Sequence, residues 1–410
     1  MPDTDALRIA VRKFDPFERA IMRQYASFQS ASGCPLRLEA VPLDLNPLAD
    51  SLFAHGGLRT GEWDIAFIVN DWLAEAVEGE ALLDLAPLLR ERPIPDYPAG
   101  WAPALTGFQQ YGDGVYGIPY HDGPECFIYR RDLFEAPAEQ QAFAAQHGHA
   151  LDVPRTWKEF EAIARFFTRP DEGLYGTIFA AFPDGHNTVY DFCLQLWSRG
   201  GDLTDAAGGV TLDTPPAVAA LDFYRRLVND RGVSPPELQE VDSVKSGERF
   251  AAGEIAMMVN WFGFAAVCEQ TGCPVKGKVA VAPVPAGEGG RSASLNAYWL
   301  LGIGAGSRHR DEAYAFLHHV ASPAMDKLTT LEGGIGCRRS TWQDPEVNAA
   351  IPFYHRLAEL HEHTRTLPRS RLLPRLVQVI DAAVQRALTG DEPTEAILRD
   401  AQTEAVALRL

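Results

Sequence analysis

The feature that most constrains the fold is an alternation of short β-rich runs with longer helical patterns in the first 120 residues. The run LRIAV at 7–11 precedes an amphipathic stretch at 16–30, and the run WDIAFIV at 63–69 precedes a helical region that ends near Leu89. Strands that alternate with helices form sheets whose strands are largely parallel. We therefore predict an α/β fold with a first core over about residues 1–120.

A chain of 410 residues is too long for that core alone, and its length predicts two or three domains, of which we take two. Three further helical patterns, at 156–167, 187–199 and 215–230, predict a second, helix-rich core. The first of these begins with the sequence of a capping box, Thr156 with Glu159.

The next segments resemble the first core, because strand-like runs again precede a helical pattern. Strand-like runs at 279–284 and 297–305 precede a helical pattern at 311–320. If these segments rejoin the first core, the chain crosses between its domains more than once. Its domains are then discontinuous, and the crossings form a hinge.

Charge and hydropathy exclude several partners. The 37 Lys and Arg residues against 55 Asp and Glu give a net charge of −18, so the field around the chain repels nucleic acids and anionic membrane surfaces. No apolar run reaches the roughly 18 residues of a transmembrane helix, and the start, MPDTDALRIAVRKF, lacks the basic and apolar regions of a signal peptide. Either the protein works in the cytoplasm or a leader has been removed.

Motifs for nucleotide binding and nucleophilic catalysis are incomplete. The run GCPVKGKV at 272–279 has P-loop spacing but places Val279 where a Ser or Thr binds Mg²⁺. The run GIGAGS at 302–307 places Ser307 at the last glycine of a dinucleotide fingerprint. There is no GxSxG sequence. We predict no cofactor.

Cysteines and histidines leave two questions open. Cys268 and Cys273 are near enough in sequence for a short disulfide loop, although two free core thiols are the favoured interpretation. The run HRLAELHEH at 355–363 would place two histidines and two glutamates within about 100° on one helix. Such a face is either a metal site or, as we favour, a solvated surface, and we predict no metal ligands.

Aromatic side chains occur beside amides and carboxylates at predicted strand ends and loop starts. Sugars present both apolar CH faces and hydroxyl groups, so a site that pairs stacked rings with polar groups suits them. The candidate groups are Asn70-Asp71-Trp72, Tyr120-His121-Asp122, His186-Asn187 with Tyr190, and Asn260-Trp261-Phe262. Any one group is explained equally well by core packing, but four together favour a carbohydrate site.

Longer segments carry a family resemblance over nearly the whole chain. They are GVYGIPYHDGPECFIYRRDLF (114–134), VPRTWKEF (153–160), LWSRGGDLTD (196–205), ALDFYRRLV (220–228) and ERFAAGEIAMMVNW (248–261). In order and spacing they resemble family 1 extracellular solute-binding proteins of ABC importers, the carbohydrate-binding group that includes maltodextrin-binding protein.

The resemblance implies a two-lobed type II periplasmic-binding fold. A solute would be captured in the cleft by hinge closure and presented to a membrane permease, without catalysis and by a monomer. The implied N-terminal lobe is 1–121 with 263–320, and the C-terminal lobe is 122–262 with 321–410, so that the strand ending at Val259 is a hinge crossing. Because most members are secreted, we expect a periplasmic or extracytoplasmic location and a leader removed from this chain.

The resemblance also assigns candidate ligand contacts. Asp71 matches a position that hydrogen-bonds sugar hydroxyls, with Asn70 and Trp72 beside it. Trp261 and Tyr190 match aromatic residues that stack on the ligand. The remaining candidates are the rest of the four groups above, together with Lys13, Asp15 and Asn296.

Three positions bear on the kind of ligand. Asp122 lies one position from a carboxylate used by some members, where this chain has Gly123. Val377 stands where maltodextrin binders have a stacking tryptophan, which indicates a smaller or different sugar. Arg338 and Arg339 match a loop that often reaches the cleft, and they indicate either an anionic ligand, such as a uronate or sulfonated sugar, or solvent-facing charge.

Two other classes of function stay open at this point. A carbohydrate-active hydrolase or lyase would use Asp122 or Glu125 as its acid or base. A metal-binding receptor would use tyrosines with His355 and His363. The interpretation that we favour is the carbohydrate receptor of an importer.

Overall fold

The computed structural model describes residues 5–406 and 408, and it divides into two compact units. Unit 1 contains the chain as far as Gly123 together with Ala297–Ala358. Unit 2 contains Pro124–Asn296 and the chain from Glu359 onward. Each unit is therefore formed by two separate segments of the chain.

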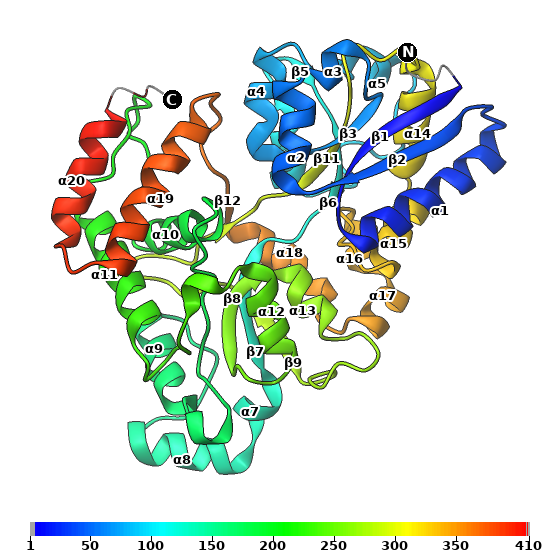
Figure 1. The fold of residues 1–410 in the computed structure, drawn as a ribbon. Helices are drawn as coiled ribbons and strands as arrows, with labels where there is room; N and C mark the ends of the chain where they lie inside the picture. Colours follow the sequence, from blue (N-terminus) through cyan, green and yellow to red (C-terminus); the bar gives the residue numbers. More distant parts are fainter. Residues whose placement is uncertain (1–4, 407, 409–410) are drawn as a thin grey trace. The chain divides into compact units, whose positions relative to one another are not determined.

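Unit 1 is built on a five-stranded sheet in the order β2-β1-β3-β11-β6 (Figure 1). β1 pairs in parallel with both β2 and β3, whereas β11 runs antiparallel to both of its neighbours, β3 and β6. The parallel arrangement predicted from sequence thus holds for the first three strands only. The strands are β1 (Ala6–Arg12), β2 (Arg37–Leu43), β3 (Ile65–Val69), β6 (Ile118–His121) and β11 (Trp299–Ile303), with a separate hairpin of β4 (Gln110–Tyr111) and β5 (Gly114–Val115).

Helices complete unit 1, and its core lies where α1 meets the sheet. Phe17 and Ile21 of α1 are fully buried, and the Phe17 ring lies 5.2 Å from that of Phe67 on β3. The helices are α1 (Asp15–Ser32), α2 (Leu45–Ala49), η1 (Asp50–Ala54), α3 (Gly57–Thr60), η2 (Asn70–Trp72), α4 (Leu73–Glu78), α5 (Ala86–Glu91), α6 (Pro103–Phe108), α14 (Arg310–Val320), α15 (Pro323–Leu331), α16 (Arg339–Trp342), α17 (Pro345–Ala350) and η5 (Tyr354–Arg356).

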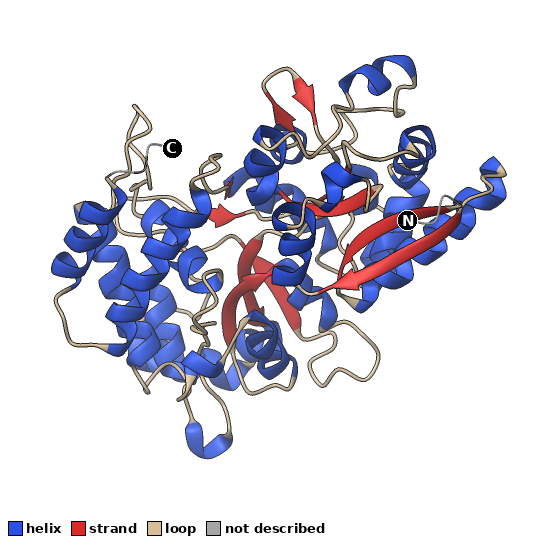
Figure 2. Ribbon diagram, turned by 45° about the horizontal axis from the view of Figure 1, so that its top comes forward, coloured by secondary structure: helices blue, strands red, loops and turns tan. Residues whose placement is uncertain are grey.

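Unit 2 combines a small antiparallel sheet with many helices (Figure 2). β7 (Glu125–Arg130) is central, between β8 (Met257–Trp261) and β9 (Val279–Ala282). A second, two-stranded sheet pairs β10 (Ser294–Leu295) in parallel with β12 (Thr364–Arg365).

The helical part of unit 2 surrounds α10, all of whose residues are buried. α10 contacts α11 and α19, and this packing fixes the orientation of the side chains at its first turns. The helices are α7 (Arg131–Glu135), α8 (Pro137–His147), α9 (Trp157–Phe167), η3 (Pro170–Glu172), α10 (Asn187–Ser198), α11 (Pro215–Asn229), η4 (Leu238–Glu240), α12 (Ser243–Ala251), α13 (Phe262–Val267), η6 (His361–His363), α19 (Leu373–Thr389) and α20 (Thr394–Ala405), while α18 (Leu357–Leu360) spans the last boundary between the units.

The boundaries differ from those that the resemblance implied. β9 pairs with β7 in the sheet of unit 2, so the segment 263–296 stays in unit 2 and does not return to the first core. Conversely, residues 321–358 stay with unit 1. β8 extends to Trp261 and lies wholly inside unit 2, so it is not a crossing between the units.

The helices predicted at 156–167, 187–199 and 215–230 are confirmed as α9, α10 and α11. The capping box is also present. The Glu159 amide donates to Thr156 Oγ1 at 3.2 Å, and Glu159 Oε2 accepts from the Thr156 amide at 3.2 Å.

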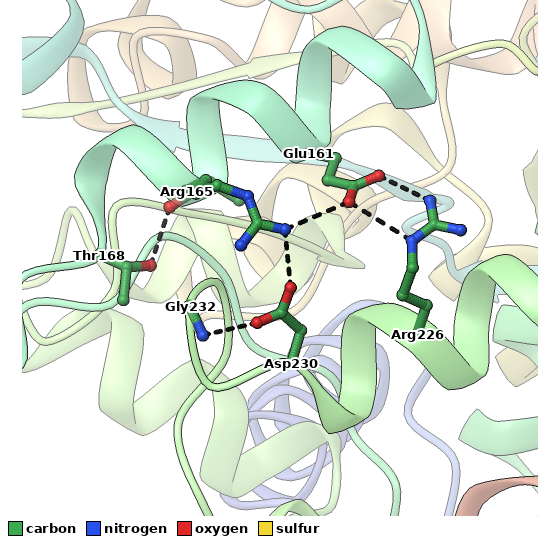
Figure 3. A network of polar contacts seen from close by, with 7 residues as sticks. Glu161, Arg165, Thr168, Arg226, Asp230 and Gly232 are labelled. Atoms are coloured by element: carbon green, nitrogen blue, oxygen red, sulfur yellow. Dashed lines mark hydrogen bonds and ion pairs between the residues drawn. The ribbon is translucent and has the colours of Figure 1, made fainter.

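An ionic network joins α9 to the end of α11 (Figure 3). Arg165 donates to Asp230 at 2.7 Å, and Arg226 donates to Glu161 at 2.7 Å. Burial by itself would raise the pKa of Asp230, but the hydrogen bonds from Arg165 and the Gly232 amide outweigh it and lower that pKa. Because the arginines are half-exposed, each pair contributes at most about 1 kcal/mol.

The capping box predicts a difference between two threonines at helix starts. Thr156→Ala removes a cap hydrogen bond from α9, so it should lower the free energy of unfolding by about 1 kcal/mol. The control is Thr214→Ala at the start of α11, where the side chain makes no cap hydrogen bond. Urea unfolding followed by circular dichroism measures both, and equal losses in the two variants would contradict the assignment.

Candidate functional site

In unit 1, the first candidate group forms the short helix η2 directly after β3. Asn70 is buried, and its Oδ1 accepts from the Tyr298 amide at 3.1 Å, so this side chain anchors η2 to the chain that leads into β11. Asp71 and Trp72 are half-buried, and the Trp72 ring makes an edge contact with Trp299 at 5.8 Å between centroids. The Trp72 and Trp299 rings therefore form an aromatic contact, with the half-buried Asp71 next to Trp72 in η2, and these three residues are called the unit 1 surface.

Lys13 and Asp15 lie at the exposed end of β1. Lys13 Nζ pairs with Asp44 at 3.3 Å, and Asp15 is the first residue of α1. Both side chains are exposed, and among the described residues Lys13 forms an ion pair whereas Asp15 does not. The Lys13 ammonium group is therefore engaged in an ion pair within unit 1.

The group at the end of β6 is largely internal. The Tyr120 hydroxyl donates to Gln24 at 3.1 Å, and the ring packs against Phe67 at 4.9 Å, which makes Tyr120 a core residue. His121 Nδ1 accepts from the Ile335 amide at 2.8 Å, and burial lowers the pKa of His121 to about 4 despite the opposing charge of Asp122. Asp122 is fully buried, and its backbone N–H donates a hydrogen bond to the Ile335 carbonyl.

The two arginines that suggested an anionic ligand have different environments. Arg338 is 1% exposed and pairs with Asp96, donates to the Ala321 carbonyl at 2.7 Å and stacks over Trp101 at 4.2 Å. Arg339, the next residue, is exposed. Because the Arg338 guanidinium is committed inside unit 1, it is not available as half of an anion-binding pair.

In unit 2, residues from two distant segments meet. The Tyr190 ring of α10 lies 5.8 Å from the Trp261 ring at the end of β8, at 89°, and His186 makes an edge contact with Tyr190 at 6.0 Å. Trp261 and His186 are half-buried. Tyr190, Trp261 and His186 form the second candidate surface, the unit 2 surface.

The other candidates in unit 2 support this surface rather than extend it. Asn260 is buried and donates to the Ser243 carbonyl at 3.1 Å and to Ser246 at 2.9 Å, while its Oδ1 accepts from the Trp261 amide at 2.8 Å. These bonds fix the backbone that carries Trp261. The remaining three candidates, Phe262, Asn187 and Asn296, are buried. Phe262 is the first residue of α13 and Asn187 is the first residue of α10. The backbone N–H of Asn296 donates to the Arg365 carbonyl at 2.8 Å.

A buried pair of carboxyl groups lies in the same part of unit 2. Glu125 is the first residue of β7 and pairs directly with Trp261 across the sheet. Asp191, which follows Tyr190, accepts a hydrogen bond from the Tyr224 hydroxyl at 3.0 Å. Burial raises the pKa of Asp191 to about 7, and burial together with the charge of Asp191 raises the pKa of Glu125.

Sequence reasoning considered Glu125 only as a catalytic group and did not single out Asp191. The available signal was an acidic residue inside the otherwise uncharged helix sequence NTVYDFCLQLWS. A buried helix with one carboxylate requires a partner for that group, and the partner here is Tyr224.

The metal interpretation of 355–363 is wrong, because this segment is not one helix. It is divided among η5, α18 and η6. Among the described residues, no group of three or more His, Cys, Asp or Glu side chains is placed to hold a metal ion.

Cys268 and Cys273 are free thiols, as the favoured interpretation held. The Cys268 thiol donates to the Phe264 carbonyl at 3.3 Å. None of the described helices is long and apolar enough to cross a lipid bilayer.

Comparison with known families decides the class of protein. The profile of the family described as bacterial extracellular solute-binding protein matches residues 51–327, more than half of the chain. The chain belongs to this family. It is therefore a non-enzymatic solute-binding receptor with an extracytoplasmic place of action, as the resemblance implied.

Two relatives illustrate the range of this solute-binding family. A probable ABC transporter-binding protein of Deinococcus radiodurans is 24% identical over 341 residues, which cover 81% of this chain and 77% of the relative. The mannitol-binding protein of Pseudomonas aeruginosa is 26% identical over 287 residues, which cover 64% of this chain and 59% of the relative.

Solved structures confirm the fold class. Maltose-bound MalE3 of T. maritima has a TM-score of 0.85 at 23% identity, with 98% of each chain covered. A solute-binding protein of Agrobacterium radiobacter K84 in complex with ribitol has a TM-score of 0.85 at 24% identity, with 99% of each chain covered. The solute-binding protein described here has the type II periplasmic-binding fold.

The contrast between the two arginines generates a stability prediction. Arg338→Met removes a charged hydrogen-bond donor from Asp96 and from the Ala321 carbonyl, so it should cost about 2 kcal/mol of unfolding free energy. Arg339→Met, at the exposed neighbouring position, should change it by less than about 0.5 kcal/mol. Urea unfolding compares them, and an undisturbed Arg338→Met protein would refute the internal role.

The raised pKa of Asp191 generates a pH prediction. Between about pH 4 and pH 7 the native protein holds a proton on Asp191 that the unfolded chain releases, so stability falls as pH rises through this window. The slope contributed is at most about 1.4 kcal/mol per pH unit. His121, with its lowered pKa, contributes the opposite slope, so the wild-type profile alone is not diagnostic.

The variant Asp191→Asn isolates the effect. The stability difference between wild type and variant, measured by urea unfolding from pH 5 to pH 8, should shift in favour of the variant as pH rises. Asp213→Asn, at an exposed position, is the control and should give a pH-independent difference. A constant difference for Asp191→Asn would show that this carboxyl is not held protonated.

Proposed function

We propose that this receptor binds a small polyhydroxylated solute, a sugar or a sugar alcohol, and delivers it to the permease of an ABC importer. The observation that carries the proposal is the perpendicular contact of Tyr190 with the half-buried Trp261, at 5.8 Å between ring centroids. Rings held in this way present an apolar wall for the CH groups of a polyol, and nearby polar groups serve its hydroxyls.

We propose further that each unit presents a surface of its own that suits a polyhydroxylated solute. Each supplies aromatic rings with polar neighbours, Asp71 in unit 1 and His186 in unit 2.

Relatives support the choice of a small solute. Of the relatives named above, one is a mannitol-binding protein, one is bound to maltose and one is in complex with ribitol. The family resemblance matches Val377 to a position where maltodextrin binders carry a tryptophan. The Val377 side chain lies close to Gly185, beside His186, so a smaller solute than a long maltodextrin fits the proposal.

The hydrolase or lyase alternative is not retained, because the members of this family bind solutes without converting them. The metal-receptor alternative is not retained either, because the described residues offer no metal-binding cluster. Monomeric action with the permease as partner remains part of the proposal.

A thermal-shift screen tests the class of solute. Ribitol, mannitol, glucose and maltose are compared with glucuronate and with amino acids, because a compound that binds only the native state raises its apparent stability. We expect shifts among the sugars and sugar alcohols. Shifts confined to amino acids would contradict the proposal.

A variant of the aromatic wall tests the site. Trp261→Ala should weaken the affinity for the best compound of the screen by about 1–3 kcal/mol, since it removes the ring that packs against the solute. Isothermal titration calorimetry measures the loss. Met22→Ala, at an exposed apolar side chain of α1, is the control, and equal affinities of the two variants would remove Trp261 from the site.

A further inference from the structure

The carboxyl pair of Glu125 and Asp191 adjoins the unit 2 surface. Residues directly opposite each other in an antiparallel pair project from the same face of the sheet, so Glu125 lies on the face that carries Trp261. Trp261 contacts Tyr190, and Asp191 follows Tyr190 in α10. The Trp261 and Tyr190 rings and the two acids thus come from the same two parts of unit 2, the paired strands β7 and β8 and the helix α10.

This pair lacks a positive partner. Glu125 is 3% exposed and Asp191 is 7% exposed, and no Lys, Arg or His side chain of the described residues forms an ion pair with either. Glu125 Oε2 is buried without a hydrogen-bond partner among the described residues. The groups that face the pair are Tyr224, which donates to Asp191, and Asp184, whose charge acts on Tyr224.

Two adjacent buried carboxyl groups do not both ionise readily, because desolvation and mutual repulsion oppose the second charge. Burial raises the pKa of both groups, and the charge of Asp191 adds to the rise for Glu125. Without solute, burial and repulsion therefore oppose full ionisation of the pair and favour a form in which one carboxyl group keeps its proton. A buried charge without a cation is costly, so a cation that enters has a large effect.

We propose that Glu125 and Asp191 are the charged part of the solute site and select a solute that carries an amino group, such as an amino sugar or amino polyol, over its neutral and anionic analogues. This inference rests on the proposed function and names the solute class more closely. An ammonium group satisfies the unpartnered carboxylate oxygen through a charge-assisted hydrogen bond. The rings of Trp261 and Tyr190 offer cation–π contacts to the same group.

Binding would exchange one cation for another. The solute enters as an ammonium ion, the protonated carboxyl group of the pair gives its proton to the buffer, and both carboxylates are then ionised against one positive charge. The site carries one negative charge before and after this exchange. A neutral solute has no such requirement, and an anionic solute adds repulsion.

The test uses matched compounds and calorimetry. Glucose, glucosamine and glucuronate form one set, and sorbitol with its amine glucamine forms another. Titrations at pH 7 in buffers of different ionisation enthalpy report the number of protons released. We expect the amine of at least one set to bind tenfold or more tightly than its neutral analogue, with release of about one proton.

Variants separate recognition from structure. Glu125→Gln keeps the size of the side chain and should abolish both the amine preference and the proton release. Asp191→Asn is a second variant with the same expectation, should the first fold poorly. Glu269→Gln, which alters another buried carboxylate of unit 2, is the control and should keep both properties.

Outcomes that overturn the inference are distinct from those that overturn the proposed function. Equal affinity for amine and neutral analogue, or amine binding without proton release, contradicts the role of the pair and leaves the receptor for polyhydroxylated solutes standing. If neither set binds although other sugars shift the melting temperature, the amine inference fails alone. If no sugar or sugar alcohol binds, both proposals fail.

Discussion

The pairing of β7 with β8 is the constraint on which the unit 2 surface depends. Antiparallel register places Trp261 opposite Glu125, and the amide of Asn260 ties the end of β8 to α12 through Ser243 and Ser246. Since α10 is buried along its whole length, Tyr190 is held where it meets Trp261. A shift of one residue in register would turn Trp261 to the other face of the sheet and separate the wall from its acids.

The charged residues of the two units do not support the anionic ligand that Arg338 and Arg339 indicated as one possibility. The Arg338 guanidinium stabilises the interior of unit 1 through Asp96 and Trp101. In unit 2, Glu125 and Asp191 are buried, and neither forms an ion pair with a cation among the residues that the structure describes. Proteins retain an arrangement of the second kind at a cost in stability, and this cost is understandable where a ligand makes use of it.

Much of the fold could be predicted from local patterns. The capping box at Thr156 and the apolar spacing of α11 depend on neighbouring residues only, and both helices formed where the sequence placed them. The boundaries of the units depend on long-range pairing. β9 joins β7 across about 150 residues, and nothing in the sequence VAVA distinguishes a strand of one sheet from a strand of the other.

The sequence predicted which residue types to consider for the candidate site. It did not predict which of them lie at a surface and which serve as internal hydrogen-bond partners. Trp261, Tyr190 and His186 were chosen as aromatic or polar residues near element ends, and they do come together. Asn260 and Tyr120 satisfied the same criterion but serve as internal hydrogen-bond partners, which only the positions of Ser246 and Gln24 reveal. The sequence did not connect Asp191 with Glu125. Their burial without an ion pair among the described residues depends on how distant segments pack, which the sequence does not show.

The most direct test of the account is a calorimetric titration of the wild-type protein with ribitol, mannitol and maltose, followed by nuclear magnetic resonance of the recovered solute. The account predicts saturable binding of at least one of them at one solute per chain, with the solute recovered unchanged. Conversion of the solute into a product, or no saturable binding of any polyhydroxylated compound, would contradict it.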